Sequence, residues 1–387
     1  MICPCGRSRF HWLRRFCALI CAVVGCCALP PTRAQSPDFD KPLQSIDEEI
    51  TAFAFAPDGR IVYSVRHNLK TRLYDLQRDD IWLQETTGKR RRILLGEKFS
   101  RGNTPFSYTV NSFRWSPNGR LLLAQLFTTK VIDDSGKTED SPMTLVLEDN
   151  GKEVRINGRD SLISGSTNAF WLLDNKTIVY LTEAVKPRAL YSLQYTNIAT
   201  GPAGPAFEGR TFLGLDTIPG TNAAIAVEQD SSLSGPPRLQ HLDLLAQIDI
   251  ELATLVSYEG GISVSPSGKK VAFFLDKEVL EVRDLTPPER VTRIRVGLGV
   301  FHWAPDESRI LLKRAVEKKT ADVVWIDLPP LFVPTPPDRS VSVTQPAPQP
   351  ILHGLGFRDV AISPDGRFLG VIATGNRSLL IYPLADR

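Results

Sequence analysis

The residue types that most often carry catalysis are scattered in this sequence. After residue 34 the histidines are His67, His241, His302 and His353, and none forms an HxH or HExxH pair that would hold a metal ion. The nearest approach to the Gly-x-Ser-x-Gly elbow of a serine hydrolase is GISVS from Gly261, which lacks the second glycine. That segment alternates like a strand, so we interpret it as structural. We predict no catalytic residue, no metal site and no cofactor.

Two charged runs are interpreted as surface features. DDSGKTED, residues 133–140, has the clustered carboxylates that calcium prefers, but its spacing does not match the twelve-residue loop of an EF-hand. KRRR, residues 89–92, leads into an apolar segment, and charges at such a place discourage pairing between sheet edges. The first run therefore predicts a solvated loop. The second predicts edge protection, with a patch for anionic glycans or lipid headgroups as the alternative.

The first 34 residues have the parts of a secretory signal peptide. Four arginines between residues 7 and 15 are followed by the apolar run CALICAVVGCCAL, and PPTRA then leads to a cleavage position after Ala34. The apolar run is short for a bilayer span, which takes about 20 residues. We therefore predict an extracytoplasmic protein, periplasmic or secreted, that begins at Gln35.

Two other interpretations of this segment stay open. Val23-Val24-Gly25-Cys26 resembles a bacterial lipobox, in which Cys26 would be the acylated first residue of a lipoprotein and its link to the membrane. The segment would otherwise stay in place as an uncleaved anchor.

Removal of residues 1–34 changes the composition of the chain. All six cysteines lie within this segment, so the remainder has neither disulfides nor thiolate ligands. Five of the 46 basic residues also leave, so that 41 basic residues stand against 43 acidic ones and the net charge changes from +3 to −2. The basic balance of the full chain therefore gives no reason to expect a nucleic-acid partner.

One apolar–turn–apolar pattern recurs through the rest of the chain. In FAFAPDGRIVYS, which begins at Phe53, apolar residues two and four places before the proline mark a strand with one buried face. Pro-Asp-Gly then supplies a fixed φ, a side chain that bonds the backbone ahead and a residue that tolerates positive φ. A second apolar strand follows, so the pattern predicts a β-hairpin. Equivalent turns carry Pro117, Pro266, Pro305 and Pro364, and looser copies begin at Asn168 and Phe212.

A third strand, and often a fourth, follows each hairpin, as in DIWLQET from Asp80 and KRRRILL from Lys89. Four-stranded units at intervals of about 40–60 residues are typical of a β-propeller, whose blades stack in a ring. We predict an all-β fold of seven four-stranded blades, in a single domain over residues 35–387. Six blades is the alternative count, because the two middle copies are irregular. Trp115, Trp171 and Trp303 recur at matching places, which indicates packing between blades.

The last unit has only three strands before the chain reaches residue 387. Because an unpaired sheet edge needs a partner, we expect residues 38–46 to supply the missing outer strand and to close the ring. An open solenoid of the same hairpins is the alternative.

The turn sequences resemble the repeats of TolB-type, WD40-like propellers and of the N-terminal propellers of prolyl-oligopeptidase-type peptidases. FAFAPDGRIVYS, FRWSPNGRLLLA and AISPDGRFLGVI carry the resemblance, which extends over residues 51–387. It implies a fold more than a function, because such blades serve scaffolds, gates and some enzymes. We recognise neither the α/β domain that precedes the propeller of TolB nor the hydrolase domain of the peptidases. The partner of TolB is therefore not carried over.

His302 is the histidine for which this architecture offers a role. It lies between Phe301 and Trp303 in an alternating segment, so its side chain should point to the opposite side from theirs. In a ring of blades, His302 could then face the neighbouring blade or line the central channel, where propeller enzymes collect histidines. We favour a structural role for His302, and a channel-lining residue is the alternative.

A proline-rich segment interrupts the sixth unit. Residues 329–350 contain eight prolines, a composition that favours polyproline II over strands. We predict an insertion on the outer rim, either a disordered loop or an exposed arm that docks a partner. The candidate contact residues of this arm are Leu331, Phe332, Val333, Pro336 and Pro337.

Three functions are compatible with these observations. We favour a non-enzymatic scaffold or ligand-binding module that binds another protein of the cell envelope, with Asp-Gly turns, Asn168 and Ser265 on its binding face. The main alternative is a channel-centred lyase or lactonase for a sugar-derived substrate, which needs histidines or carboxylates that converge on the axis. The third is a detached propeller that gates a separately encoded peptidase.

Overall fold

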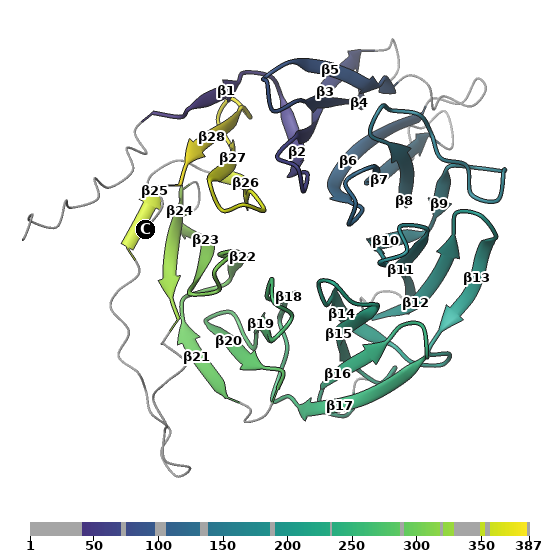
Figure 1. The fold of residues 1–387 in the computed structure, drawn as a ribbon, viewed down its shortest axis with the longest axis vertical. Coiled ribbons are helices and arrows are strands. Elements are labelled where there is room, and N and C mark those ends of the chain that lie inside the picture. Colours follow the sequence, from purple (N-terminus) through teal and green to yellow (C-terminus); the bar gives the residue numbers. More distant parts are fainter. Residues whose placement is uncertain are drawn as a thin grey trace, which may run out of the picture. The chain divides into compact units, whose positions relative to one another are not determined.

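The protein is all-β, as the sequence predicts. The computed structural model describes residues 41–70, 75–96, 106–131, 138–185, 190–232, 234–286, 290–317, 320–328, 349–352 and 357–384. All of them belong to one compact unit, Phe39–Leu384. Their regular elements are 28 strands and no α-helix (Figure 1). Within these ranges there is accordingly no helix long and apolar enough to cross a membrane. The predicted signal peptide and Cys26 lie outside them.

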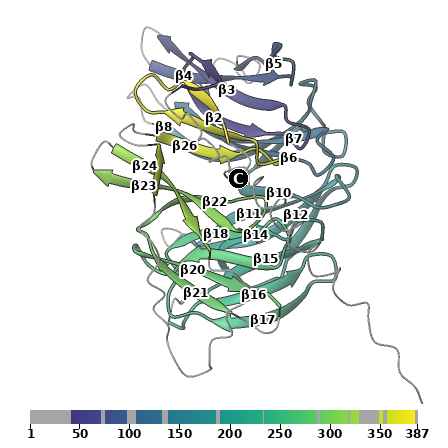
Figure 2. The ribbon, with the colours of Figure 1, turned by 60° about the vertical axis from the view of Figure 1, so that its left-hand side comes forward.

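The strands form antiparallel groups of four that follow the sequence repeat. The first two groups are β2 (Ile50–Phe55), β3 (Ile61–Lys70), β4 (Asp75–Gln84) and β5 (Arg90–Leu94), then β6 (Phe106–Trp115), β7 (Leu121–Val131), β8 (Thr138–Glu148) and β9 (Leu162–Ser164). The third and fourth groups are β10 (Ser166–Trp171), β11 (Thr177–Val185), β12 (Leu190–Asn197) and β13 (Gly201–Ala206), then β14 (Phe212–Thr217), β15 (Ala223–Glu228), β16 (Arg238–Asp243) and β17 (Ile248–Thr254). A single residue pair, of β4 with β6 and of β12 with β14, joins the groups two by two into eight-stranded sheets. Figure 2 shows β14 to β17 side by side in the second of them.

The remaining groups have the same order. The fifth and sixth are β18 (Gly260–Val264), β19 (Lys270–Phe274), β20 (Val279–Asp284) and β21 (Val291–Arg295), then β22 (Gly299–Trp303), β23 (Arg309–Glu317), β24 (Thr320–Asp327) and β25 (Gln349–Leu352). The last group combines β26 (Phe357–Ile362), β27 (Phe368–Ala373) and β28 (Leu379–Pro383) with β1 (Gln44–Ile46) from the start of the chain.

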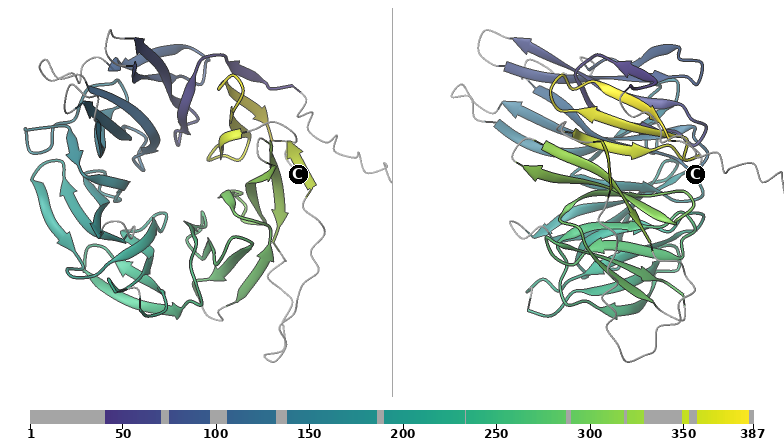
Figure 3. Two further views of the ribbon diagram at one scale, coloured as in Figure 1. Left: turned by 180° about the vertical axis from the view of Figure 1, so that it is seen from behind. Right: turned by 90° about the vertical axis from the view of Figure 1, so that its left-hand side faces the viewer.

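Strand β1 takes the edge position that we expected for a strand within residues 38–46. It pairs antiparallel with β28, with Gln44 opposite Ile381 and Ile46 opposite Leu379. In Figure 3 the purple β1 lies beside the yellow strands of the last group. The blade count and the closed ring stay predictions.

The core is divided among the boundaries between successive groups. One cluster of buried apolar side chains joins the first group to the second, and comparable clusters follow along the chain. Another joins Ile46 and Tyr63 to Ile372 and Leu379 of the last group. Trp115, Trp171 and Trp303 are buried in these clusters, so the sequence interpretation of the tryptophans as packing residues holds.

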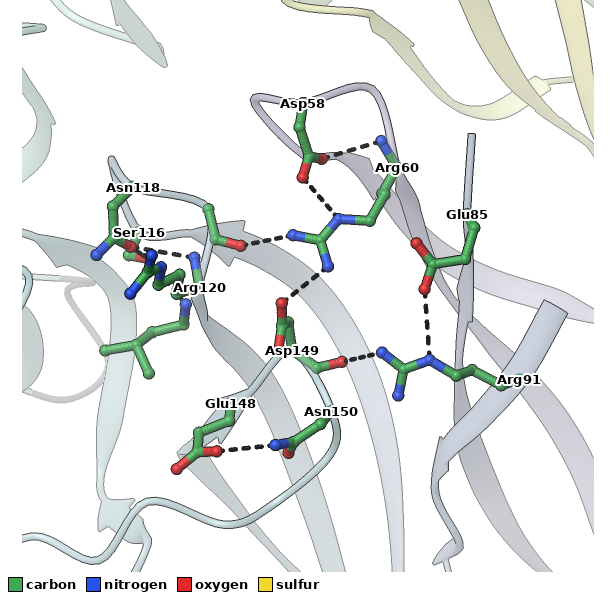
Figure 4. A network of polar contacts seen from close by, with 12 residues as sticks. Asp58, Arg60, Glu85, Arg91, Ser116, Asn118, Arg120, Glu148, Asp149 and Asn150 are labelled. Atoms are coloured by element: carbon green, nitrogen blue, oxygen red, sulfur yellow. Dashed lines mark hydrogen bonds and ion pairs between the residues drawn. The ribbon is translucent and has the colours of Figure 1, made fainter. Parts of the chain in front are cut away.

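The hairpin turns are tied to one another by side chains. Arg60 follows the first turn and is bonded to Asp58 of its own turn, to Oδ2 of Asp149 at 2.9 Å and to the carbonyl oxygen of Gly119 at 2.9 Å (Figure 4). Arg91 donates to the carbonyl oxygen of Asp149 at 2.9 Å. These contacts connect the first group to the turns of the second.

One turn departs from the glycine pattern. Glu307 stands where Gly59 and Gly268 stand in their turns, and it adopts φ +58. Its carboxylate accepts a hydrogen bond from the backbone N–H of Ser267 and lies 3.8 Å from Nζ of Lys270. The unfavourable φ is therefore accompanied by contacts to the neighbouring turn.

Candidate functional site

The first strand of each group carries one residue at an equivalent position relative to the hairpin turn. This residue lies three places before the turn proline or its equivalent. Four of the seven are polar, whereas Phe170 belongs to a core cluster and Ala54 and Ala361 pack against others. We call these residues the inner row: Ala54, Arg114, Phe170, Asp216, Ser263, His302 and Ala361. Figure 1 shows that the first strands are the ones nearest the common centre. The polar members of the inner row are Arg114, Asp216, Ser263 and His302.

Arg114 is held by its neighbours in the inner row. Its guanidinium carbon lies 4.0 Å from the centre of the Phe170 ring, and its Nη1 lies 3.7 Å from Oδ1 of Asp216. The three residues come from β6, β10 and β14, so the contact joins three consecutive groups. The Arg114 side chain is nevertheless 45% exposed. Burial among the inner strands lowers its pKa, but arginine starts so far above neutrality that the group stays charged.

Asp216 is fixed by backbone donors. Its Oδ2 accepts the N–H of Val264 at 2.8 Å, and its Oδ1 accepts the N–H of Thr217 at 3.0 Å. Burial raises the pKa of Asp216. Arg114 and the two N–H groups stabilise the carboxylate and lower this pKa, but by less than burial raises it. Ionisation of Asp216 is thus opposed by its burial and favoured by Arg114 and the two N–H donors.

His302 of the inner row lies near Asp359 and Lys313, and its channel-lining role stays a prediction. Its Nε2 atom is buried and has no hydrogen-bond partner among the described residues. Burial lowers the pKa of His302, although the charge of Asp359 opposes this shift. Burial raises the pKa of Asp359, against the effect of His302. Beside them, Nζ of Lys313 donates to the carbonyl oxygen of Arg358 at 2.6 Å.

The cluster of His302, Asp359 and Lys313 has groups that can exchange a proton or a hydrogen bond with a ligand. A neutral imidazole with an unpaired nitrogen can accept a proton or a hydrogen bond from a ligand. A carboxylic group with a raised pKa beside it is a usual feature of acid–base sites, and also of structural ion pairs. In the described ranges, no group of three or more histidine, cysteine, aspartate or glutamate side chains is placed to hold a metal ion.

Two residues that we expected on a binding face have different environments. Asn168 is exposed at the start of a hairpin, with φ +46. Ser265 is fully buried, and its Oγ accepts the backbone N–H of Lys270 at 3.1 Å. Ser265 therefore stabilises its own turn and does not face a partner, which corrects the expectation.

The remaining predicted contact residues are Leu331, Phe332, Val333, Pro336 and Pro337, and they lie outside the described residues.

A second candidate surface lies on the outer strand of the fourth group, β17. The described outer strands other than β17 either have three residues, as in β1 and β9, or carry arginine or proline, as in β5, β13, β21 and β25. Short strands, basic residues and proline all protect an edge against pairing. Strand β17 has the sequence IDIELAT and is the longest of these outer strands. It has neither basic residues nor proline, and its charged residues are the acidic Asp249 and Glu251.

The exposed side chains of β17 alternate between apolar and acidic over its first four residues. Ile248 is 59% exposed, Ile250 is 58% exposed, and Leu245 in the preceding turn is 63% exposed. On the alternate positions, Asp249 lies 2.9 Å from Nη1 of Arg210 and Glu251 lies 4.0 Å from Nη1 of Arg238. Strand β17 pairs with β16 and with no other strand of the described residues. It lies on the outer edge of its group (Figure 1), and its first four residues alternate apolar and acidic side chains.

Comparison with known proteins supports the fold. No protein-family model matches the sequence, and no curated protein matches it. A chain in the crystal structure of a mitotic checkpoint complex superposes over 89% of this chain and 92% of its own, with a TM-score of 0.53 and 12% identity.

A prolyl endopeptidase, from work on inter-domain dynamics in two such enzymes, superposes over 88% of this chain with a TM-score of 0.57 and 12% identity. The chain spans 51% of the length of that enzyme. Both neighbours contain β-propellers, so the protein has a propeller fold. Identities this low carry no information on function.

Proposed function

We propose that the protein is an exported, non-enzymatic propeller that binds another protein of the cell envelope. The observation that carries this proposal is the open edge of β17, which is the longest of the described outer strands and has neither the basic residues nor the proline found in most of the others. Exposed apolar edges are liabilities in a protein without partners, and in binding modules they are the place where a partner adds a strand.

The chemistry of β17 defines the partner segment. An incoming strand would pair its backbone with the free edge and lay apolar residues against Ile248 and Ile250. On its alternate positions, basic residues would face Asp249 and Glu251, whose side chains are 42% and 44% exposed. The partner segment is therefore an extended strand that alternates apolar and basic residues.

A site-specific crosslink tests this mode of binding. A photo-crosslinking residue at position 250 should capture one protein from the envelope of the source cell, and the captured peptide should alternate apolar and basic residues. Ile250→Lys should abolish capture by a crosslinker at position 248. The matched control is Val291→Lys, because Val291 is 43% exposed on the outer strand β21. Equal capture in both variants, or capture of a second copy of this chain, would contradict the proposal.

The location in the envelope rests on the predicted signal peptide. N-terminal sequencing and intact mass of the protein from its own cell should give Gln35 as the first residue. A diacylated or triacylated Cys26 would instead give a membrane-anchored lipoprotein, which keeps the envelope location. An unprocessed chain in the cytoplasm would overturn the location. The TolB-type resemblance of the turns agrees with an envelope protein and identifies no partner.

The same crosslinking experiment also tests the proline-rich segment. Deletion of residues 331–347 leaves β25 in place, so a loss of capture in this variant would assign part of the contact to Leu331, Phe332, Val333, Pro336 and Pro337. Unchanged capture would show that the segment does not contribute.

The alternative function is a channel-centred lyase or lactonase for a sugar-derived substrate. The observation that favours it is the unpaired Nε2 of His302 beside Asp359. Turnover of a panel of sugar lactones and uronic-acid glycosides should then fall about 100-fold or more in His302→Gln, the size of a general acid–base contribution. Turnover that persists in this variant would contradict it.

A further inference from the structure

We propose that a small carboxylate group binds in a pocket beside Arg114, independently of the edge of β17. The pocket has a volume of about 60 Å³ and lies between the second and third groups, at the inner ends of their sheets. Its polar lining comes from Ser112 and Arg114 on β6, Gln125 on β7, Thr144 on β8 and Asn168 on β10. Apolar core residues form the rest of the wall.

The polar groups of this pocket are incompletely satisfied. Ser112 and Asn168 line the pocket and are exposed to solvent, and the structure gives neither side chain a hydrogen bond to another described residue. Gln125 is 9% exposed and donates from Nε2 to the carbonyl oxygen of Ser166 at 3.3 Å, which leaves its Oε1 free. Thr144 is fully buried and accepts the hydroxyl of Ser166 at 2.7 Å. Hydroxyl and amide groups that converge without partners provide hydrogen bonds for a polar ligand.

Arg114 supplies a positive charge, and its side chain is held in position before a ligand binds. Stacking on Phe170 and the single contact to Asp216 hold the guanidinium plane, while most of its five N–H donors stay available. A planar guanidinium matches a carboxylate through two parallel hydrogen bonds. A held side chain also loses little conformational freedom on binding.

Charge and size select the class of anion. Asp216 lies 3.7 Å from Arg114, so a ligand with two negative charges would be repelled more strongly than one with a single charge. A pocket of about 60 Å³ matches the liquid volume of about two water molecules. That is room for one carboxylate group, with the rest of the ligand outside the pocket. The source of the carboxylate is either a free small acid or the C-terminus of a peptide.

Calorimetric titration of the purified full chain tests the site. The probes are acetate, N-acetyl-trialanine, the C-terminal amide of the same peptide, and sulfate. Acetate and the free-acid peptide should bind, whereas the amide and sulfate should bind at least about tenfold more weakly, a difference of ~1.4 kcal/mol. A peptide affinity at least about tenfold above that of acetate would identify a peptide C-terminus as the source. Equal affinities would identify a free small acid.

Variants assign the binding to the pocket. Arg114→Gln should weaken acetate and peptide binding about tenfold or more, because a charge-assisted pair is lost. Arg120→Gln is the matched control, since Arg120 is an exposed arginine of the following turn that does not line the pocket. Ser112→Ala should weaken binding a few-fold, and it keeps the test valid if Arg114→Gln fails to fold. Sulfate binding as tight as that of acetate, or binding that Arg114→Gln or Ser112→Ala leaves unchanged, would overturn the proposal.

Discussion

The carboxylate of Asp79 accepts two hydrogen bonds from the guanidinium of Arg66, at 2.9 Å from Nε to Oδ1 and at 3.1 Å from Nη2 to Oδ2. Its Oδ2 also accepts the backbone N–H of Val110 at 2.7 Å and the hydroxyl of Thr51 at 2.9 Å. Asp79 is completely buried. This carboxylate therefore connects β2, β3 and β4 of the first group to β6 of the second through satisfied hydrogen bonds.

Replacement of Asp79 should be strongly destabilising. Asp79→Ala leaves the Arg66 side chain, which is only 10% exposed, without its counter-charge, and it also leaves a buried N–H group without an acceptor. We expect a loss of about 3–5 kcal/mol in the free energy of unfolding, measured by urea denaturation. Asp58→Ala is the control, because Asp58 is 53% exposed in its pair with Arg60, and it should lose less than about 1 kcal/mol. Similar losses in the two variants would contradict this account.

The arginine after the first turn should matter more than its counterpart in the last group. Arg60 is 14% exposed, contacts Asp149 and Gly119 of the next group and lies 5.4 Å from the ring centre of Trp115. Arg367 follows the same Pro-Asp-Gly sequence, but it is 67% exposed and its ion pair is with Asp365 of its own turn. We expect Arg60→Ala to cost about 1.5–3 kcal/mol and Arg367→Ala less than about 1 kcal/mol in urea denaturation. Equal costs would show that the contact between groups adds no stability.

Pairing of β1 with the last group should hold the two ends of the chain together. Ile46 is 1% exposed in the cluster that contains Leu379 and Ile381, whereas Leu43 is 66% exposed. Ile46→Ala should lower the stability by about 2–5 kcal/mol, and Leu43→Ala should have almost no effect. Deletion of residues 39–45 should lower the melting temperature measured by circular dichroism. An unchanged melting temperature in the deletion variant would contradict closure through β1.

Much of the fold was predictable because the signals are local. Proline and glycine fix the hairpin turns within four residues, and the alternation before each turn identifies the buried face. The expectation for β1 followed from a unit that lacked one strand. Glu307 shows the limit of this reasoning, since its positive φ is accompanied by a bond to Ser267 of another turn, which the local sequence does not reveal.

The candidate site was only partly predictable. Alternation singled out His302, whose Nε2 is buried without a hydrogen-bond partner among the described residues, and its channel-lining role stays a prediction. Arg114 and Asp216 show the same alternation, but their meeting depends on how three consecutive groups stack, which no local pattern encodes. Asp359 was missed for the same reason. In four of the seven units the residue three places before the turn is polar, a signal that becomes visible when the units are aligned on their turns. Asp359 lies five places before Pro364, so this signal does not identify it.

Protonation of His302 should oppose folding at acid pH. Burial lowers the pKa of this imidazole in the folded protein below its unfolded value of about 6.5. As the pH falls through that value, the unfolded chain takes up a proton that the folded protein resists. The unfolded state then binds more protons, so stability is complete above about pH 6.5 and declines as the pH falls toward the folded pKa. The limit is ~1.4 kcal/mol for each pH unit of that interval.

Urea denaturation of wild type and His302→Gln at pH 7.5, 6.5 and 5.5 measures this effect. The wild type should lose more stability than the variant over this range, and the difference should develop below about pH 6.5. His241→Gln is the control for removal of an imidazole elsewhere in the chain. Burial raises the pKa of Asp359, which adds stability as its carboxylate takes up a proton, so Asp359→Asn separates the two contributions. Parallel pH profiles of wild type and His302→Gln would show that the imidazole is free to take up a proton in the folded protein, and the lowered pKa would then be wrong.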